Sequence, residues 1–349
     1  MTAVRRSMAC VAMLVIFAAC AHGQSPPVVD TALPTYAART EVSGDIHCAG
    51  GSTMQDLAEE WARLFRLRHP RATVRIGHHT TLSAEGFAEL LEGRVNCVTF
   101  VREPFKAELS AFKAKFGYPP LVVNVAGGSY STKGGTHAIA IYVNANNPLG
   151  RLTLTELDAI FSKSLHRGGV AITKWGQLGL GGEWATRPIH AYTMPRRRDT
   201  ANPPGIMNYL EQRLLLGGEF RDDVREQHDA SGAPALAAIV NRVAADPEGI
   251  GFSGFGFAVR GVKGLALAEA EGRAYFVGNP QQVASRQYPL SRQIYLMVNL
   301  APGRPLAPTM REFLLLALSR EGQHVVAIDR TRFIPLSVAQ AAAARSQID

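Results

Sequence analysis

Cysteine is scarce in this sequence: the 349 residues contain four, and two of these lie within the first 20 positions. This number is too small for a disulfide scaffold or a cysteine-rich zinc array. Charged residues make up 19% and hydrophobic residues 46%, which is a globular rather than a disordered composition. The 33 glycines and 20 prolines are ordinary for this length and exclude collagen-like proteins. The length suggests two to three domain-sized units.

Two motifs of common hydrolases are also missing. The segment GFSGF (251–255) lacks the final glycine of a Gly-x-Ser-x-Gly nucleophile elbow, and no HExxH helix occurs. The formal net charge is +8 for the whole chain, which favours anionic partners but is modest for a nucleic-acid-binding protein. We therefore expect neither an enzyme nor a nucleic-acid-binding protein, and we expect no cofactor.

The N-terminus has the pattern of an export signal. Arg5 and Arg6 precede an apolar stretch from Met8 to Ala19, which is too short to span a bilayer. We predict a signal peptide over residues 1–23 that ends in a small-x-small cleavage site. A second interpretation is a lipobox in which Cys20 becomes lipidated, so a soluble and a lipid-anchored exported protein both remain open. Removing the leader leaves 35 basic against 29 acidic residues, a net charge of about +6.

The mature chain alternates between short apolar runs and segments with the 3.6-residue period of amphipathic helices. This alternation predicts an α/β fold with parallel strands. Residues 24–43 are polar and contain proline, so we expect a linker there. Two capping boxes are expected, Ser52 with Gln55 and Thr153 with Glu156. The predicted strands include 44–49, 73–77, 94–101, 137–144, 189–193, 249–257 and 288–300.

The loop after the first predicted strand, Gly50-Gly51-Ser52-Thr53, is suited to an anion. Backbone N–H groups and the positive end of the following helix favour negative charge, and the two hydroxyls add donors. The alternative is that Ser52 only caps the helix.

A second candidate anion loop runs from Met194 to Asn202 and contains Arg196, Arg197 and Arg198. Arginine offers planar, bidentate donors to oxyanions. The alternative is a solvated basic loop partly neutralised by Asp199. Arg102, after the third predicted strand, is a third candidate, although a single arginine is usually a surface residue.

Six segments, taken in order, carry a resemblance to a known family. They are AGGSTM (49–54), HAIAIYVNANNPLGRLTLTELDAIF (137–161), KWGQLG (174–179), GIGFSGFGFA (249–258), YPLSRQIYLMV (288–298) and FLLLALSREGQHVVAI (313–328). The chain resembles the PstS-like substrate-binding proteins of phosphate ABC transporters, from about Ile46 to Leu336. The resemblance implies a two-lobed periplasmic binding protein fold, α/β, each lobe a mostly parallel sheet flanked by helices, with the ligand cleft between them. It places residues 44–138 and 262–349 in lobe 1 and residues 139–261 in lobe 2.

The resemblance also implies a set of ligand-binding residues. Gly51, Ser52 and Thr53 match the first phosphate loop, and Arg102 keeps the arginine of the third strand without its neighbouring hydroxyl. Arg197 matches the arginine of the second lobe, and Arg198 and Thr200 are further candidates. Ala201-Asn202-Pro203 replaces the Ser-Gly-Thr of the family, which removes two hydroxyls and one N–H donor. Asp199 is the nearest candidate acceptor for a phosphate proton.

Cys48 and Cys97 lie in two predicted strands and form a disulfide if those strands are neighbours; otherwise they are two buried thiols. Four histidines near predicted strand ends have no metal-ligand spacing beyond one adjacent pair, and we expect no metal site; they are His47, His78, His79 and His137.

The leading hypothesis is an exported, periplasmic, monomeric solute-binding protein that captures phosphate or a related oxyanion for an ABC permease in the inner membrane. The alternatives are a binding-fold protein that has lost transport and acts as a sensor or interaction protein, or one that binds a different anion.

Overall fold

A six-stranded sheet forms the centre of the first lobe in the computed structural model, which describes residues 27–38, 40–77, 82–196, 204–228 and 234–348. The strand order is β13-β4-β12-β3-β1-β2. Its strands are β1 (Gly44–Gly50), β2 (Ala72–Ile76), β3 (Cys97–Phe100), β4 (Leu121–Ser129), β12 (Gln293–Val298) and β13 (Phe333–Ile334). The helices of this lobe are η1 (Ser52–Met54), α1 (Gln55–Arg68), α2 (Ser83–Glu92), α3 (Lys106–Phe116), α8 (Pro308–Ala317), α9 (Arg320–Ile328) and α10 (Val338–Arg345).

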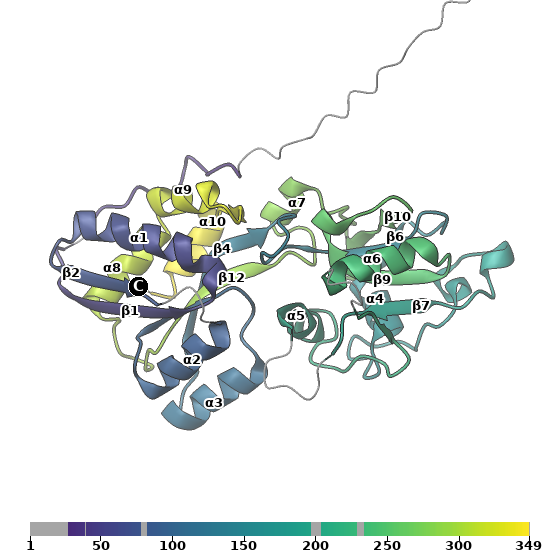
Figure 1. The fold of residues 1–349 in the computed structure, drawn as a ribbon, viewed down its shortest axis with the longest axis horizontal. Coiled ribbons are helices and arrows are strands. Elements are labelled where there is room, and N and C mark those ends of the chain that lie inside the picture. Colours follow the sequence, from purple (N-terminus) through teal and green to yellow (C-terminus); the bar gives the residue numbers. More distant parts are fainter. Residues whose placement is uncertain (1–26, 39, 78–81, 197–203, 229–233, 349) are drawn as a thin grey trace, which may run out of the picture.

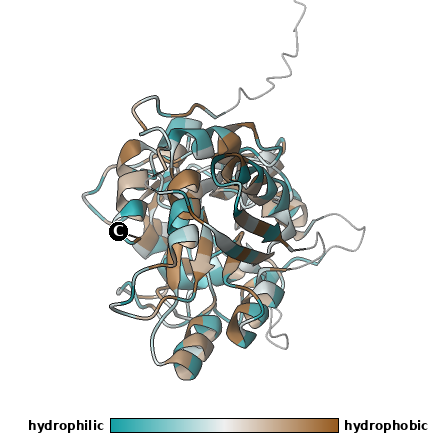
Figure 2. Cartoon of the chain, turned by 90° about the vertical axis from the view of Figure 1, so that its left-hand side faces the viewer, coloured by the Kyte–Doolittle hydropathy of each residue, from teal (hydrophilic) through white to brown (hydrophobic). Residues whose placement is uncertain are grey.

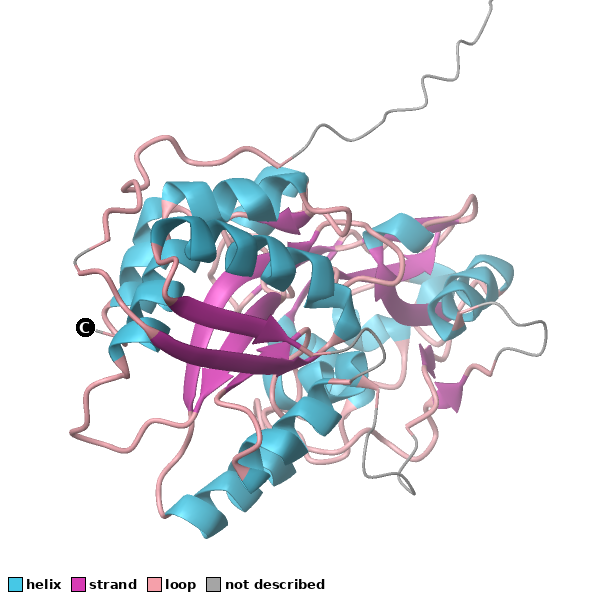
Figure 3. Ribbon diagram, turned by 60° about the vertical axis from the view of Figure 1, so that its left-hand side comes forward, coloured by secondary structure: helices cyan, strands magenta, loops and turns pink. Residues whose placement is uncertain are grey.

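Helices cover both faces of this sheet (Figure 3). One face packs against α1, α8 and α9 around a buried cluster that includes Trp61, Phe65 and Phe313. The other face packs against α2 and α3 through Phe87, Phe100, Phe112 and their neighbours. Hydrophobic (brown) and hydrophilic (teal) segments alternate along the helices of this lobe (Figure 2), as expected for helices with one buried side.

The second lobe contains a five-stranded sheet in the order β10-β5-β9-β7-β8 and a small pair, β11-β6. Its strands are β5 (Ile139–Asn144), β6 (Arg151–Thr153), β7 (His190–Thr193), β8 (Arg225–Glu226), β9 (Gly249–Gly254), β10 (Val262–Gly264) and β11 (Ala266–Ala268). Its helices are α4 (Leu154–Phe161), η2 (Trp175–Leu178), η3 (Gly182–Trp184), α5 (Gly205–Arg213), α6 (Ala235–Ala245), η4 (Phe255–Phe257) and α7 (Pro280–Ala284). Every residue of β5 is buried, as expected for a strand covered on both faces.

The two lobes lie side by side along the long axis of the molecule (Figure 1). This confirms the predicted two-lobed α/β fold. Both sheets are mixed, however. Strands β1, β2 and β3 pair in parallel, whereas β12 runs antiparallel to β3 and to β4. In the second lobe, β5 is antiparallel to β9 and β10. The antiparallel pairs arise where the chain passes between lobes and enters a sheet without a helical crossover.

The return from the second lobe to the first comes later than expected. We placed it at residue 262, but Val262 pairs with Asn144 of β5 and Ala266 pairs with Arg151 of β6. Tyr288 and Leu290 also belong to the buried cluster of the second lobe. The chain therefore enters the first sheet only with β12, because the apolar side chains before it are buried against the second lobe.

The segment expected to be a linker is packed onto the first lobe in its described part. Leu33 is fully buried, and its carbonyl accepts a hydrogen bond from Arg320 Nε at 3.0 Å. The Tyr36 hydroxyl donates to Glu312 Oε2 at 2.8 Å and lies 2.6 Å from His69 Nε2. Burial of these apolar and aromatic side chains holds the segment on the first lobe, although its polar composition predicted a linker. The predicted leader and Cys20 lie outside the described residues. Among the helices of the described part, none has both the length and the apolar character needed to cross a bilayer.

Candidate anion-binding site

The carboxyl edge of the first sheet brings together loops that are distant in sequence. Gly51 follows β1 and donates its N–H to the Thr99 carbonyl of β3 at 3.0 Å. The helix α2 approaches the end of β1 so closely that a Cβ at Gly86 would lie 2.7 Å from the Gly50 Cα. Glycine at these positions therefore lets the N-terminus of α2 and the loop after β1 share one small region.

Ser52 and Thr53 do not cap the helix that follows them. They form the short helix η1, whose N-cap is Gly51, and neither η1 nor α1 has a side-chain cap. The predicted capping box is wrong, since the Gln55 amide donates to Glu59 Oε1 at 2.6 Å instead. Neither hydroxyl makes a hydrogen bond to another described residue. As far as the described residues are concerned, both of these half-buried residues therefore keep a hydroxyl available for a ligand.

A cavity of about 450 Å³ opens beside these two hydroxyls. It joins the loop after β1 to the crossover segment between β4 and β5 and to the turn before β13. Its lining is rich in hydroxyl, glycine and cationic residues: Ser52, Thr53, Thr132, Lys133, Gly134, Gly135, Arg330 and Thr331. Our sequence analysis missed the last six, because nothing along the chain indicates that the TKGGT segment (132–136) lies beside the first loop.

The charge at this cavity is positive. Lys133 has no carboxylate partner among the described residues, and its Nζ lies 5.3 Å from the ring centroid of Phe257 in the second lobe. Arg330 Nε lies 2.7 Å from Asp56 Oδ2 in a largely exposed ion pair. No carboxylate belongs to the described lining of the cavity. Donors, one unpaired cation and the N-terminal end of α1 together favour an anion.

Arg102, which we predicted to bind the ligand, is not among the described residues that line this cavity. Its guanidinium is buried and bound to Glu108 through two hydrogen bonds, of 2.9 and 2.6 Å. It also lies over the Phe105 ring, with 3.6 Å between the guanidinium carbon and the ring centroid. Glu108 occupies the third position of α3 and also accepts the Phe105 N–H at 2.7 Å. This capping interaction fixes the carboxylate where it captures the arginine.

The other predicted site residues, Arg197, Arg198 and Thr200, lie outside the described residues, as do Asp199, Asn202 and Pro203. On one side of them, Arg196 Nε lies 2.6 Å from Glu226 Oε1, so this arginine is already paired. On the other side, α5 begins at Gly205 with Pro204 at its N-cap. The first N–H groups of α5 have no helical partner.

Cys48 and Cys97 face each other on β1 and β3, which are parallel neighbours with these two residues in register. Their Cα atoms are 4.3 Å apart, and the structure joins their sulfur atoms. Both side chains are buried. The covalent link lies two residues before Gly50, at the base of the first anion loop.

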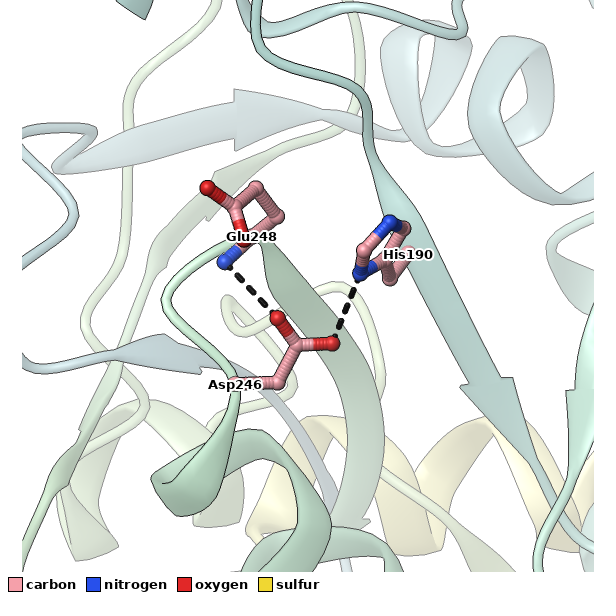
Figure 4. Close-up of side chains that lie close together, drawn as sticks. All are labelled: His190, Asp246 and Glu248. Atoms are coloured by element: carbon pink, nitrogen blue, oxygen red, sulfur yellow. Dashed lines mark hydrogen bonds and ion pairs between the residues drawn. The ribbon is translucent and has the colours of Figure 1, made fainter.

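Three side chains of the second lobe lie as close together as metal ligands, with one ligand atom each within 4.8 Å of the others: His190, Asp246 and Glu248 (Figure 4). The Asp246 carboxylate, however, already binds His190 Nδ1 at 2.8 Å, the Tyr192 hydroxyl and the Glu248 N–H. Burial opposes ionisation, but the bonds from Tyr192 and His190 outweigh it and hold the pKa of Asp246 below its usual value. The neighbouring cations Arg225 and Arg242 also bond the Tyr192 hydroxyl. This cluster joins β7 to the turn before β9 and is poorly suited to a cation.

Neither His47 nor His137, the two histidines within the described residues that we considered as ligands, belongs to this cluster. His137 is buried against the Phe257 ring, and burial lowers its pKa below the usual value. His47 lies on β1, and His78 and His79 are outside the described residues.

Comparison with known proteins identifies the family of this chain. The sequence matches the PBP superfamily domain over residues 35–321. The chain belongs to this superfamily, in its PstS-like branch. It is 36% identical to the phosphate-binding protein PstS of Pseudomonas aeruginosa over 315 residues, 90% of each chain. It is 25% identical to the protein SphX of Synechococcus elongatus over 254 residues, which is 72% of this chain and 66% of that protein.

Solved structures of this superfamily share the fold. The PstS structure from Borrelia burgdorferi superposes with a TM-score of 0.54 at 14% identity, covering 84% of this chain and all of that one. An ABC-type phosphate transport receptor from Vibrio cholerae gives 0.51 at 17% identity, with the same coverage. At these identities the likeness supports the two-lobed architecture of this PBP superfamily member and nothing finer.

Proposed function

We propose that this chain is an exported solute-binding protein that captures phosphate, or a closely related oxyanion, and delivers it to an ABC permease. The observation that carries the proposal is the cavity beside Ser52 and Thr53, whose described lining consists of donors and cations without a carboxylate. The 36% identity to a phosphate-binding protein over nine-tenths of the chain supports phosphate as the first ligand to test. The protein performs no reaction, and its work is capture and release.

Capture uses both lobes. The Ser52 and Thr53 hydroxyls and the backbone N–H of Ser52 bind one side of the anion, and Lys133 supplies positive charge. Gly51 positions them, because its own N–H donates to the Thr99 carbonyl of β3. Arg197, Arg198 and Thr200 bind it from the second lobe. Arg102 contributes indirectly. Its pairing with Glu108 shapes the loop after β3. Hinge motion of the lobes then closes them around the ligand.

Titration calorimetry of the mature chain, residues 24–349, tests this proposal. The protein is unfolded and refolded to remove bound ligand, and phosphate is titrated first, with sulfate as the control. Micromolar or tighter phosphate binding without sulfate heat is the expected result. Folded protein that gives no phosphate heat would overturn the phosphate assignment and point to a different anion.

The compartment and the assembly state follow from the same proposal. We infer a periplasmic monomer, either free or anchored through a lipid on Cys20. Mass spectrometry of the protein from membrane and soluble fractions distinguishes a chain that begins after residue 23 from a lipidated chain that begins at Cys20.

A further inference from the structure

Helix α5 connects the two lobes outside the crossover segments. Its apolar side, with Met207 and Leu210, belongs to the buried cluster of the second lobe. Its other side reaches the loop after β3 in the first lobe. Figure 1 shows α5 at the inner side of the second lobe, facing the first.

Two side-chain amides of α5 bind the loop after β3 in the first lobe. Asn208 Nδ2 donates to the Glu103 carbonyl at 3.2 Å, and Gln212 Nε2 donates to the Pro104 carbonyl at 3.1 Å. Gln212 also donates to Asn208 Oδ1 at 2.8 Å, which holds the two amides in one orientation. One turn of helix separates them, so they meet consecutive carbonyls of the facing loop.

Tyr209 of the same helix packs against the segment that leads into β12. Its hydroxyl donates to the Ser291 carbonyl at 2.9 Å, and its buried ring lies 5.1 Å from the guanidinium carbon of Arg292. Arg292, 5% exposed, binds Glu103 Oε2 at 2.7 Å. The loop that receives the two amides is thus held by a buried ion pair, and α5 packs against that pair.

The first residue of α5 also lies close to the first lobe. A Cβ at Gly205 would lie 3.1 Å from the Cβ of Arg102, so the first turn rests closely on the arginine stem and a larger residue there would require the stem to shift. Arg102 is itself fixed by Glu108. The receiving surface in the first lobe is therefore rigid, with each of its charged side chains paired.

We propose that Asn208 and Gln212 form an interlobe latch that sets how readily the lobes close, and hence the anion affinity, without touching the anion. The effect on affinity rests on the proposed function, but the effect on lobe closure does not. Each amide bond contributes modestly. Because the contacts join two bodies that hinge, their loss shifts the equilibrium toward the open arrangement.

The test compares the double variant Asn208→Ala/Gln212→Ala with wild type and with Asn241→Ala, a control on the exposed face of α6 in the same lobe. Small-angle X-ray scattering of ligand-free protein should show a larger radius of gyration for the double variant only. Its calorimetric Kd for inorganic phosphate should rise by about fivefold or more. Unchanged radius and Kd in a folded double variant would overturn the latch.

Gln212→Ala alone provides a second route if the double variant does not fold. It removes the bond to the Pro104 carbonyl and keeps the bond from Asn208 to the Glu103 carbonyl, so it should shift both quantities in the same direction by a smaller amount. An unchanged radius and Kd here would also contradict the latch. If wild type binds no phosphate, the proposed function fails, and the scattering comparison alone still decides whether α5 holds the lobes together.

Discussion

Glu108 binds the guanidinium of Arg102 through both carboxylate oxygens, and the two side chains are 9% exposed. Removing one partner leaves the other charge buried and uncompensated, which typically costs about 3–5 kcal/mol. We expect Glu108→Gln to lower the free energy of unfolding by about that amount in a urea titration. Glu60→Gln removes the exposed pair with Arg63 and should cost less than about 1 kcal/mol. Equal effects of the two variants would contradict a structural role for the buried pair.

The hydroxyls of Ser52 and Thr53 should matter for binding and little for stability. Hydrogen bonds to charged groups contribute about 1.5–3 kcal/mol, so Ser52→Ala and Thr53→Val should each weaken phosphate binding by roughly 10- to 100-fold. The melting temperature should stay near that of wild type, since neither hydroxyl bonds another described residue. Ser285→Ala, at the exposed C-cap of α7, is the control for calorimetry. Wild-type affinity in both site variants would place the anion elsewhere.

Lys133 should contribute through charge. Replacing it by methionine keeps most of the stem and removes the cation beside the first loop. We expect weaker phosphate binding at low salt and a smaller dependence of Kd on ionic strength, because salt screens the lost interaction. Lys113→Met, on the exposed surface of α3, should change neither quantity. Parallel salt curves for wild type and Lys133→Met would exclude this role.

The Cys48–Cys97 link should be present in the exported protein and should stabilise it. A thiol assay on the denatured, unreduced mature chain should detect no free thiol. Closing a loop with a sequence separation of 49 residues stabilises a fold by about 4 kcal/mol in the chain-entropy description. The Cys48→Ala/Cys97→Ala variant should therefore unfold at a lower urea concentration. Two reactive thiols per chain would show instead that the pair is reduced.

His69 should make the protein less stable in mild acid. It is fully buried, and desolvation lowers its pKa below the usual value despite the opposing charge of Glu312. The unfolded chain then binds a proton at a higher pH than the folded chain. The free energy of unfolding should fall as pH falls below about 6.5 and level off below the folded pKa. His69→Gln should flatten this part of the curve, and His166→Gln, at an exposed position, should not.

The sequence alone determined the class of fold and several local elements. The strand predicted at 137–144 is the buried strand β5, which begins at Ile139, and the Thr153–Glu156 capping box is present, with Thr153 accepting the Glu156 N–H. These features depend on interactions a few residues apart, which a sequence displays directly. The order of the six family segments identified the two-lobed architecture, which the comparisons then confirmed.

Tertiary structure decided the features of the candidate site, because these features depend on residues that meet from distant parts of the chain. Ser52 and Gln55 have the same signature as Thr153 and Glu156, yet Ser52 lies inside the short helix η1, whose N-cap is Gly51, and does not cap a helix. Arg102 has the sequence context of an anion ligand, but the start of α3 places Glu108 against it. Lys133 and Arg330 are 197 positions apart and share one cavity. Local sequence determined which elements form, and packing between them decided which side chains remain free to bind.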